Sequence, residues 1–219
     1  FARDMEFTPV DTREQSALLE LRDTPETTAN YPFAFRLRIG YTLRESTIDV
    51  EYRIANPSGG VLPFSIGAHP AFNVPLCGEG SISDHTLIFD RPQTAGPTPR
   101  SARGGTLART TRPFPANADR IPVTPDLFDD GALVFRSLQS KRITLASTAF
   151  STRIRVRFDD FPFLGLWGNL GAGFICIEPW AGHADFEDAD GDLQHKAGIM
   201  LLDPGAERQL RHSISIEAR

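Results

Sequence analysis

The sequence predicts an all-β protein made of antiparallel strands, and two observations lead to this prediction. Apolar and polar residues alternate in several segments, which is typical of strands with one buried face and one face in water. The chain also contains 17 prolines and 18 glycines among its 219 residues, and no segment has a convincing amphipathic helical pattern. About a dozen short strands separated by turns is the pattern of a β-sandwich.

The alternation is clearest in residues 46–56, STIDVEYRIAN, where every second residue from Ile48 to Ile54 is apolar and charged residues stand between them. Residues 33–43, 150–158 and 208–218 alternate in the same way, and a hairpin turn is expected near Arg44–Ser46. Further strands are expected at Ser16–Arg22, Val61–Ile66, Thr86–Phe89, Ala132–Phe135, Arg142–Ala146, Leu164–Trp167, Phe174–Ile177 and Gly198–Leu202.

The organisation of the chain is predicted to be simple. The segment from Pro92 to Pro125, rich in Arg, Thr, Gly and Pro, is the best candidate for a long loop. No linker divides the sequence and no repeat of fixed period is visible, so residues 1–219 are expected to form one domain.

The composition of the chain limits the classes of function and the cellular locations that fit the sequence. The net charge of −5 argues against a nucleic-acid partner. Two cysteines, Cys77 and Cys176, are too few for a disulfide framework and fit a reducing compartment. Residues 161–177 carry no charge, but one proline and four glycines interrupt them, so no membrane span is expected. With no leader-like segment, the sequence predicts a cytoplasmic protein.

Glu178 is the most informative residue. It is the one charged residue in FLGLWGNLGAGFICIEPWAG (residues 163–182), where it follows an apolar strand and precedes Pro179 and Trp180. A bare buried carboxylate costs several kcal/mol, so Glu178 is either tied to an arginine or tuned as an acid or base in a pocket. Trp167, eleven residues before it, and Trp180 are either core residues or the aromatic faces on which a sugar ring stacks.

His69 is the second candidate. In FSIGAHPAFNVPL (residues 64–76) it stands at the expected end of a strand, after Gly67 and before Pro70. Proline restricts the preceding residue to extended geometry, and a histidine at such a loop edge is well placed to point into a cleft. A single histidine is nevertheless more often structural than catalytic.

Several phrases together resemble the aldose 1-epimerase family: an opening FAR, GAHPAFNVPL, GLWG, FICIEPWAGHAD and the closing GIMLLDPGAERQLRHSISI. The most similar branch is the bacterial one of LacX-like and hexose-phosphate epimerase-like proteins. The resemblance covers nearly the whole chain and implies an antiparallel, galactose mutarotase-like β-supersandwich. The family's second histidine precedes a GFAR motif and is missing here, as are the strands before it. The chain is therefore expected to be an N-terminally truncated fragment, the alternative being a protein that has lost part of its site.

The resemblance also implies roles. Glu178 corresponds to the general base and His69 to the general acid, and Arg3 corresponds to an arginine that contacts sugar hydroxyls. Asn73, Trp167 and Trp180 are expected to line the sugar pocket. Such an enzyme needs neither a metal nor a cofactor, and its partner is a small-molecule sugar, a hexose or hexose phosphate. We therefore expect Glu178 to be unpaired, with its pKa raised by an apolar strand end.

Alternatives remain. Arg100, Arg103, Arg109 and Arg112 could receive the phosphate of a hexose 6-phosphate. A non-catalytic carbohydrate-binding module would keep the tryptophans without the acid–base pair, and a glycoside hydrolase would need a second carboxylate such as Asp185. The acidic run HADFEDADGD does not fit a calcium loop, because Phe186 and Ala197 fall where ligands are needed. His183 and His195 lack partners at zinc-site spacing, and His183 could add a sugar contact.

Overall fold

The structure is a computed structural model that describes residues 1–78, 80–102, 104–115 and 118–218. The described residues form sixteen strands, and every pair is antiparallel, which confirms the all-β prediction. In chain order the strands are β1 (Thr8–Arg13), β2 (Ser16–Arg22), β3 (Arg36–Arg44), β4 (Thr47–Ala55), β5 (Leu62–Phe64), β6 (Ile66–Gly67), β7 (Ala71–Asn73), β8 (His85–Gln93), β9 (Ala118–Pro122), β10 (Leu133–Phe135), β11 (Arg142–Ser147), β12 (Arg153–Arg157), β13 (Phe163–Asn169), β14 (Phe174–Ala181), β15 (Met200–Leu202) and β16 (Glu207–Glu217).

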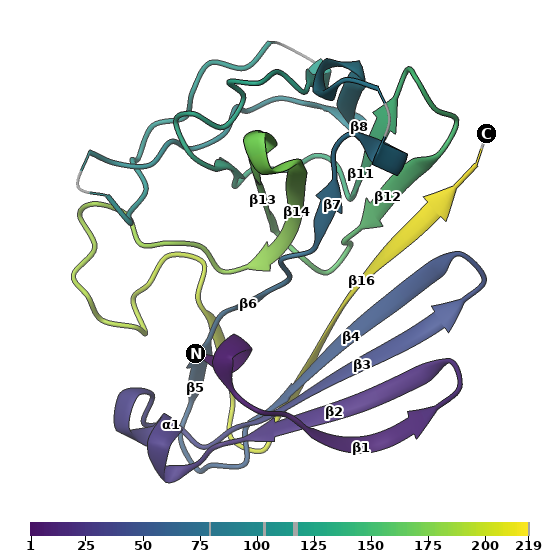
Figure 1. Ribbon diagram of the computed structural model, residues 1–219. Helices are drawn as coiled ribbons and strands as arrows, with labels where there is room; N and C mark the ends of the chain where they lie inside the picture. The colour runs from purple at the N-terminus through teal and green to yellow at the C-terminus, as the bar shows by residue number, and fades with distance from the viewer. Residues whose placement is uncertain (79, 103, 116–117, 219) are drawn as a thin grey trace.

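Two main sheets form the fold. The larger has nine strands in the order β1-β2-β3-β4-β16-β12-β11-β8-β9. The smaller contains β10, β13, β14 and β6, and β7 pairs with the first residues of β14. Strand β15 pairs with β5 in a separate two-stranded ladder. Figure 1 shows β16 running between β4 and β12, so the last strand of the chain joins the two halves of the large sheet.

The main apolar core is built from both sheets. Period-two alternation turns one side of each strand inward, and the buried side chains come from the large sheet and from β13 and β14. The most deeply buried members include Leu87, Ile143, Leu145, Val156, Leu164, Leu166, Ile175, Ile177 and Leu210. On β4 the predicted alternation holds for Val50, Tyr52 and Ile54, whereas Ile48, near the hairpin end, is 42% exposed.

Most expected strands are present, but several segments differ from the prediction, and β7 has no counterpart among the expected strands. The segment expected as one strand at Val61–Ile66 is two short strands, because Ser65 separates β5, which pairs with β15, from β6, which pairs with β14. The segment expected as a long loop at Pro92–Pro125 contains the end of β8 and the whole of β9, whose Ile121 pairs with Leu87. Strand β1 is an exposed edge strand without apolar alternation, so its sequence gives no period-two signal.

Helices are few and short. The one α-helix of the described residues, α1 (Pro25–Asn30), begins at a capping box in which Thr24 and Thr27 exchange backbone and side-chain hydrogen bonds. The 3₁₀ turns are Ala2–Asp4, Leu76–Gly78, Ile82–Asp84 and Leu170–Ala172. Among the described residues, no helix has the length and apolar character needed to cross a membrane.

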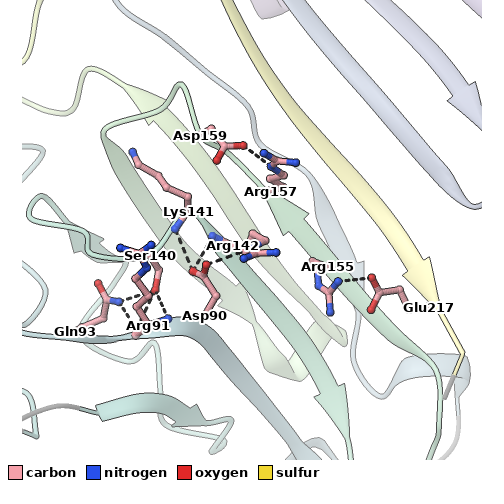
Figure 2. Close-up of polar contacts among 10 residues, drawn as sticks. All are labelled: Asp90, Arg91, Gln93, Ser140, Lys141, Arg142, Arg155, Arg157, Asp159 and Glu217. Atoms are coloured by element: carbon pink, nitrogen blue, oxygen red, sulfur yellow. Dashed lines mark hydrogen bonds and ion pairs between the residues drawn. The ribbon is translucent and has the colours of Figure 1, made fainter.

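A polar network holds the end of β8 against the start of β11 (Figure 2). The Asp90 carboxylate accepts hydrogen bonds from the Lys141 and Arg142 backbone N–H groups, both at 3.1 Å, and from Arg142 Nε at 3.2 Å. The fully buried Ser140 hydroxyl donates to the Arg91 carbonyl and accepts from Gln93 Nε2. Buried polar groups that are satisfied in this way carry little desolvation penalty.

His212 on β16 is a buried histidine of the core. Its ring stacks on Tyr52, with ring centroids 5.7 Å apart, and meets Phe161 edge-on at 6.0 Å. Its Nδ1 is buried and has no hydrogen-bond partner among the residues that the structure describes. Burial lowers the pKa of His212 to about 4, so the folded protein disfavours its protonated form.

The position of His212 predicts acid-sensitive stability. Because its pKa is about 4 in the folded chain and near 6.5 when unfolded, the unfolded state binds more protons between those values. The stabilisation is complete above the unfolded pKa and is lost as pH falls toward 4. We expect a loss of about 2 kcal/mol of unfolding free energy between about pH 7.5 and about pH 5, measured by urea denaturation.

His212→Phe keeps a ring against Tyr52 but cannot titrate. The difference between parent and variant isolates His212 from other titrating groups, including His183, whose pKa burial also lowers. An equal loss of stability in both proteins over this pH range would contradict the prediction.

Candidate active site

Strand β14 carries the centre of the candidate site. Alternation sends Ile175 and Ile177 into the core, where both are fully buried, and turns Cys176, Glu178 and Trp180 to the opposite face of the sheet. Residues of the neighbouring strand β13 pair with them in register, Trp167 with Cys176 and Gly165 with Glu178. The predicted strand therefore places Glu178 on a face of the sheet that is turned away from the main core.

The backbone around His69 brings its side chain level with Glu178. On one side of it Gly67 of β6 pairs with Trp180, and on the other Ala71 of β7 pairs with Cys176. Two backbone hydrogen bonds close the break between β6 and β7, from Ala68 N–H to the Pro179 carbonyl and from Ile177 N–H to the Pro70 carbonyl. The break in the strand thus places the His69 side chain next to the Glu178 carboxylate.

His69 and Glu178 form a close pair. His69 Nε2 lies 3.6 Å from Glu178 Oε2, within ion-pair range and just beyond hydrogen-bond distance. The exposure of the two side chains is very unequal, 62% for His69 and 4% for Glu178. An accessible imidazole therefore stands over a buried carboxylate.

The electrostatics of Glu178 follow from this setting. Burial raises the pKa of the Glu178 carboxyl, while the charge of His69 and a hydrogen bond donated by the Trp180 indole act to lower it. The expectation of an unpaired carboxylate was wrong, because both neighbours contact it. Without them the desolvation cost of the buried charge would be uncompensated.

The two tryptophans flank the pair. Trp167 meets the His69 ring edge-on, with centroids 6.5 Å apart. Trp180 lies against two glycines, since a Cβ on Gly67 would come within 2.6 Å of the indole and one on Gly165 within 2.5 Å. Both indoles are partly exposed, so they form walls beside the pair as well as packing on the sheet.

The structure places the two other predicted contacts differently. Asn73 pairs with Phe174, the first residue of β14, and Phe174 in turn packs on Trp167. Asn73 is exposed and lies on the edge of the same face. Arg3 is exposed and forms an ion pair with Asp4 at 3.2 Å, and none of the described contacts joins it to the pair.

Residues that the sequence did not single out form a wall beyond Trp180. Leu107, Val134 and Phe186 make a small second apolar cluster that packs against Trp180. The Arg136 guanidinium lies over the Phe186 ring, 4.7 Å from its centroid, and donates to the Thr98 hydroxyl. Burial and the nearby Arg109 lower the pKa of Arg136, and among the described residues no carboxylate is paired with it.

The loop arginines are mostly engaged elsewhere. Arg109 pairs with Asp188 at 2.8 Å while its guanidinium lies 4.0 Å from the Phe186 ring centroid, and Arg112 pairs with Asp130 at 3.4 Å. The Arg100 side chain passes close to Gly131. Arg103 lies outside the described residues.

The remaining candidates have structural partners. His183 is buried between Phe163 and Phe186, at 4.8 and 5.4 Å, which gives it a packing role. Asp185, the second carboxylate that a hydrolase would need, forms an ion pair with Lys196 at 2.6 Å. Asp190 pairs with His195, so carboxylates of the acidic run are held by basic residues outside it.

A large hollow elsewhere lacks comparable chemistry. It measures about 680 Å³ and lies on the outer face of the nine-stranded sheet. Its central carboxylate, Glu51, is held by Arg53 and Arg211, whose charges and hydrogen bonds outweigh burial and lower its pKa. The Glu178 pair is therefore the stronger candidate for acid–base chemistry.

Comparison with known proteins finds relatives that match most of the chain. A model of the family described as aldose 1-epimerase matches residues 1–192. The plasmid-encoded protein LacX of Lactococcus lactis subsp. lactis is 32% identical over 207 residues, which cover 93% of this chain and 69% of LacX.

Two solved structures are similar over nearly the whole chain. One is a galactose mutarotase related enzyme from Lactobacillus acidophilus, with a TM-score of 0.90, 31% identity and coverage of 100% of this chain and 73% of the other. The other is a galactose mutarotase-like protein from Lactobacillus casei, with a TM-score of 0.90, 29% identity and coverage of 99% and 75%. The galactose mutarotase-like sandwich expected from the sequence is thereby confirmed.

The contact between Gly165 and Trp180 generates a prediction. Gly165→Ala puts a methyl group 2.5 Å from the indole ring, so Trp180 must move away from Glu178. We expect a loss of about 1–3 kcal/mol in unfolding free energy and a changed tryptophan fluorescence spectrum. Gly171→Ala is the control, because its added Cβ comes no closer than 3.5 Å to a neighbour. Equal effects of the two substitutions would refute the packing argument.

Proposed function

Because the chain belongs to the aldose 1-epimerase family, we propose that it interconverts the α and β anomers of a hexose by acid–base catalysis at Glu178 and His69. One observation carries the proposal: a buried carboxylate and an accessible imidazole lie 3.6 Å apart between two tryptophans.

The reaction requires an acid and a base close together. Glu178 removes the proton from O1 of the cyclic hemiacetal while His69 donates a proton to ring oxygen O5, and the C1–O5 bond breaks to leave the open-chain aldehyde. After rotation about C1–C2, the O5 hydroxyl attacks the other face of the carbonyl and both protons return. O1 and O5 are bonded to the same carbon, so the spacing of Nε2 and Oε2 supports their action on one ring.

The burial of Glu178 supports its assignment as the base. A raised pKa makes the carboxylate a stronger proton acceptor than an exposed glutamate. The neighbouring imidazole and the Trp180 N–H group keep the ionised form accessible. An imidazole nitrogen can both donate and accept a proton, which suits a group that gives up a proton and takes it back.

The surrounding residues are proposed to hold the sugar. Trp167 and Trp180 offer apolar faces for the C–H groups of a pyranose, and Asn73 offers an amide on the same face of the sheet. Arg3 is proposed as a contact to sugar hydroxyls on the strength of the family resemblance, and the substrate would have to bring its guanidinium toward the pair.

A phosphorylated hexose is a second candidate substrate, and Arg136 favours it. Its guanidinium is half-buried on the Phe186 ring, and Phe186 packs against the Trp180 wall. Arginine without a carboxylate partner at such a position suits a phosphate dianion. The activity would then be that of a hexose-6-phosphate 1-epimerase.

Removing the base tests the activity directly. Glu178→Gln cannot accept the O1 proton, so we expect a fall of about 10²–10⁴-fold in the catalysed mutarotation rate. Polarimetry of freshly dissolved α-glucose and α-galactose measures the approach to anomeric equilibrium. Glu14→Gln, in the exposed turn between β1 and β2, is the matched control and should keep the parent rate.

The outcomes separate the classes of function. Equal rates for Glu178→Gln and the parent would reject the base assignment. A parent that binds sugar without accelerating mutarotation of any hexose, phosphorylated or free, would instead be a non-catalytic carbohydrate-binding module. Release of free sugar from a glycoside would indicate a hydrolase.

Arg136 distinguishes the two substrates. Arg136→Gln removes the charge but keeps a hydrogen-bond donor toward Thr98. With a hexose 6-phosphate we expect KM to rise by about tenfold or more, which is about 1.4 kcal/mol of lost binding, while the KM for the free hexose stays unchanged. Equal changes for both substrates would reject Arg136 as the phosphate contact.

A further inference from the structure

We propose that His69, Cys176 and Glu178 form a binding site for a thiophilic divalent cation such as Zn²⁺. Each offers one ligand atom, an imidazole nitrogen, a thiol sulfur and a carboxylate oxygen, and these atoms all lie within 4.8 Å of one another. Among the residues that the structure describes, this is the one such cluster. Three protein ligands with an open fourth position is the arrangement of many exchangeable zinc sites.

The spacing is close to what tetrahedral coordination needs. Metal–ligand bonds of about 2.0–2.3 Å place neighbouring ligand atoms about 3.4 Å apart. Nε2 of His69 and Oε2 of Glu178 are already 3.6 Å apart. The Cys176 sulfur lies within 4.8 Å of a ring nitrogen of His69 and of a carboxylate oxygen of Glu178, so small side-chain rotations complete the triangle.

The backbone holds the three residues in place without a metal. Cys176 and Glu178 are alternate residues of one strand and face the same side, where β13 pairs with them. His69 is fixed between β6 and β7 by the ladder to β14. Its side chain is 62% exposed, which gives a cation a path from solvent to the two buried ligands.

The ligand types select the class of cation. Mg²⁺ and Ca²⁺ prefer sites made entirely of oxygen ligands, whereas sulfur and imidazole favour Zn²⁺ and its neighbours in the transition series. A thiol loses its proton to solvent as the sulfur–metal bond forms, so the affinity for the cation falls as pH falls.

Occupancy has a consequence for the proposed chemistry. A cation on Nε2 and Oε2 takes the lone pairs that would exchange protons with a sugar. The cluster is thus a site at which a thiophilic cation shuts off acid–base catalysis. The inhibition rests on the proposed function, whereas the binding does not.

Cobalt provides a probe of the binding. We expect Co²⁺, titrated into the metal-free protein, to give a sulfur-to-cobalt charge-transfer band in the near ultraviolet that added Zn²⁺ abolishes. Cys176→Ser should lose this band and at least about tenfold in cation affinity, as expected for a lost ligand. Cys77→Ser is the matched control, because Cys77 is the other free cysteine and is exposed.

Three results would overturn the proposal: no charge-transfer band in the parent, a band that depends on Cys77, or a Cys176→Ser variant with the parent affinity. Cys176→Ala serves as a second variant, and circular dichroism confirms that each variant is folded. Polarimetry with and without Zn²⁺, relative to each protein's own uninhibited rate, tests the inhibition. Cobalt binding without mutarotation would reject the proposed function alone, and mutarotation without cobalt binding would reject the cation site alone.

Discussion

The antiparallel pairing of β13 with β14 is the constraint on which the candidate site depends. Because side chains alternate strictly along a strand, one ladder serves two purposes: Ile175 and Ile177 are in the core, while Glu178 is on the other face. A register slip of a single residue would exchange the faces, burying the carboxylate in the core and exposing the isoleucines. The apolar residues of β14 therefore fix the position of the carboxylate as firmly as they fix the fold.

The exposure of the pair is also set by backbone structure. The interruption between β6 and β7 leaves the three residues 68–70 outside the strands beside β14 and places His69 over Glu178. The glycines beside it, Gly67 and Gly165, let Trp180 lie flat on the sheet and reach the carboxylate. Small residues, a broken strand and one indole together permit a charge to be buried at tolerable cost.

The sequence predicts those features of this protein that depend on a single segment of the chain. Alternation identifies β4 and β12 because each strand carries its own pattern, and the isolation of Glu178 in an apolar segment is visible without any structure. Strand β1 has no apolar face, and β9 depends on its partner β8, so neither has a local signal. Arg136 and Cys176 gain their significance only from neighbours that the sheet register brings to them.

The place of β16 in the large sheet has a consequence for how the chain reaches its native state. Within the described part of the chain, β16 alone joins the four-stranded β1–β4 meander to the β12-β11-β8-β9 group, and it follows the strands of both groups in sequence. During synthesis both groups emerge before the strand that unites them, so the sheet closes in a late, long-range step. Until then β4 and β12 present unpaired edges to the surroundings, and the nascent chain depends on keeping those edges apart from other chains.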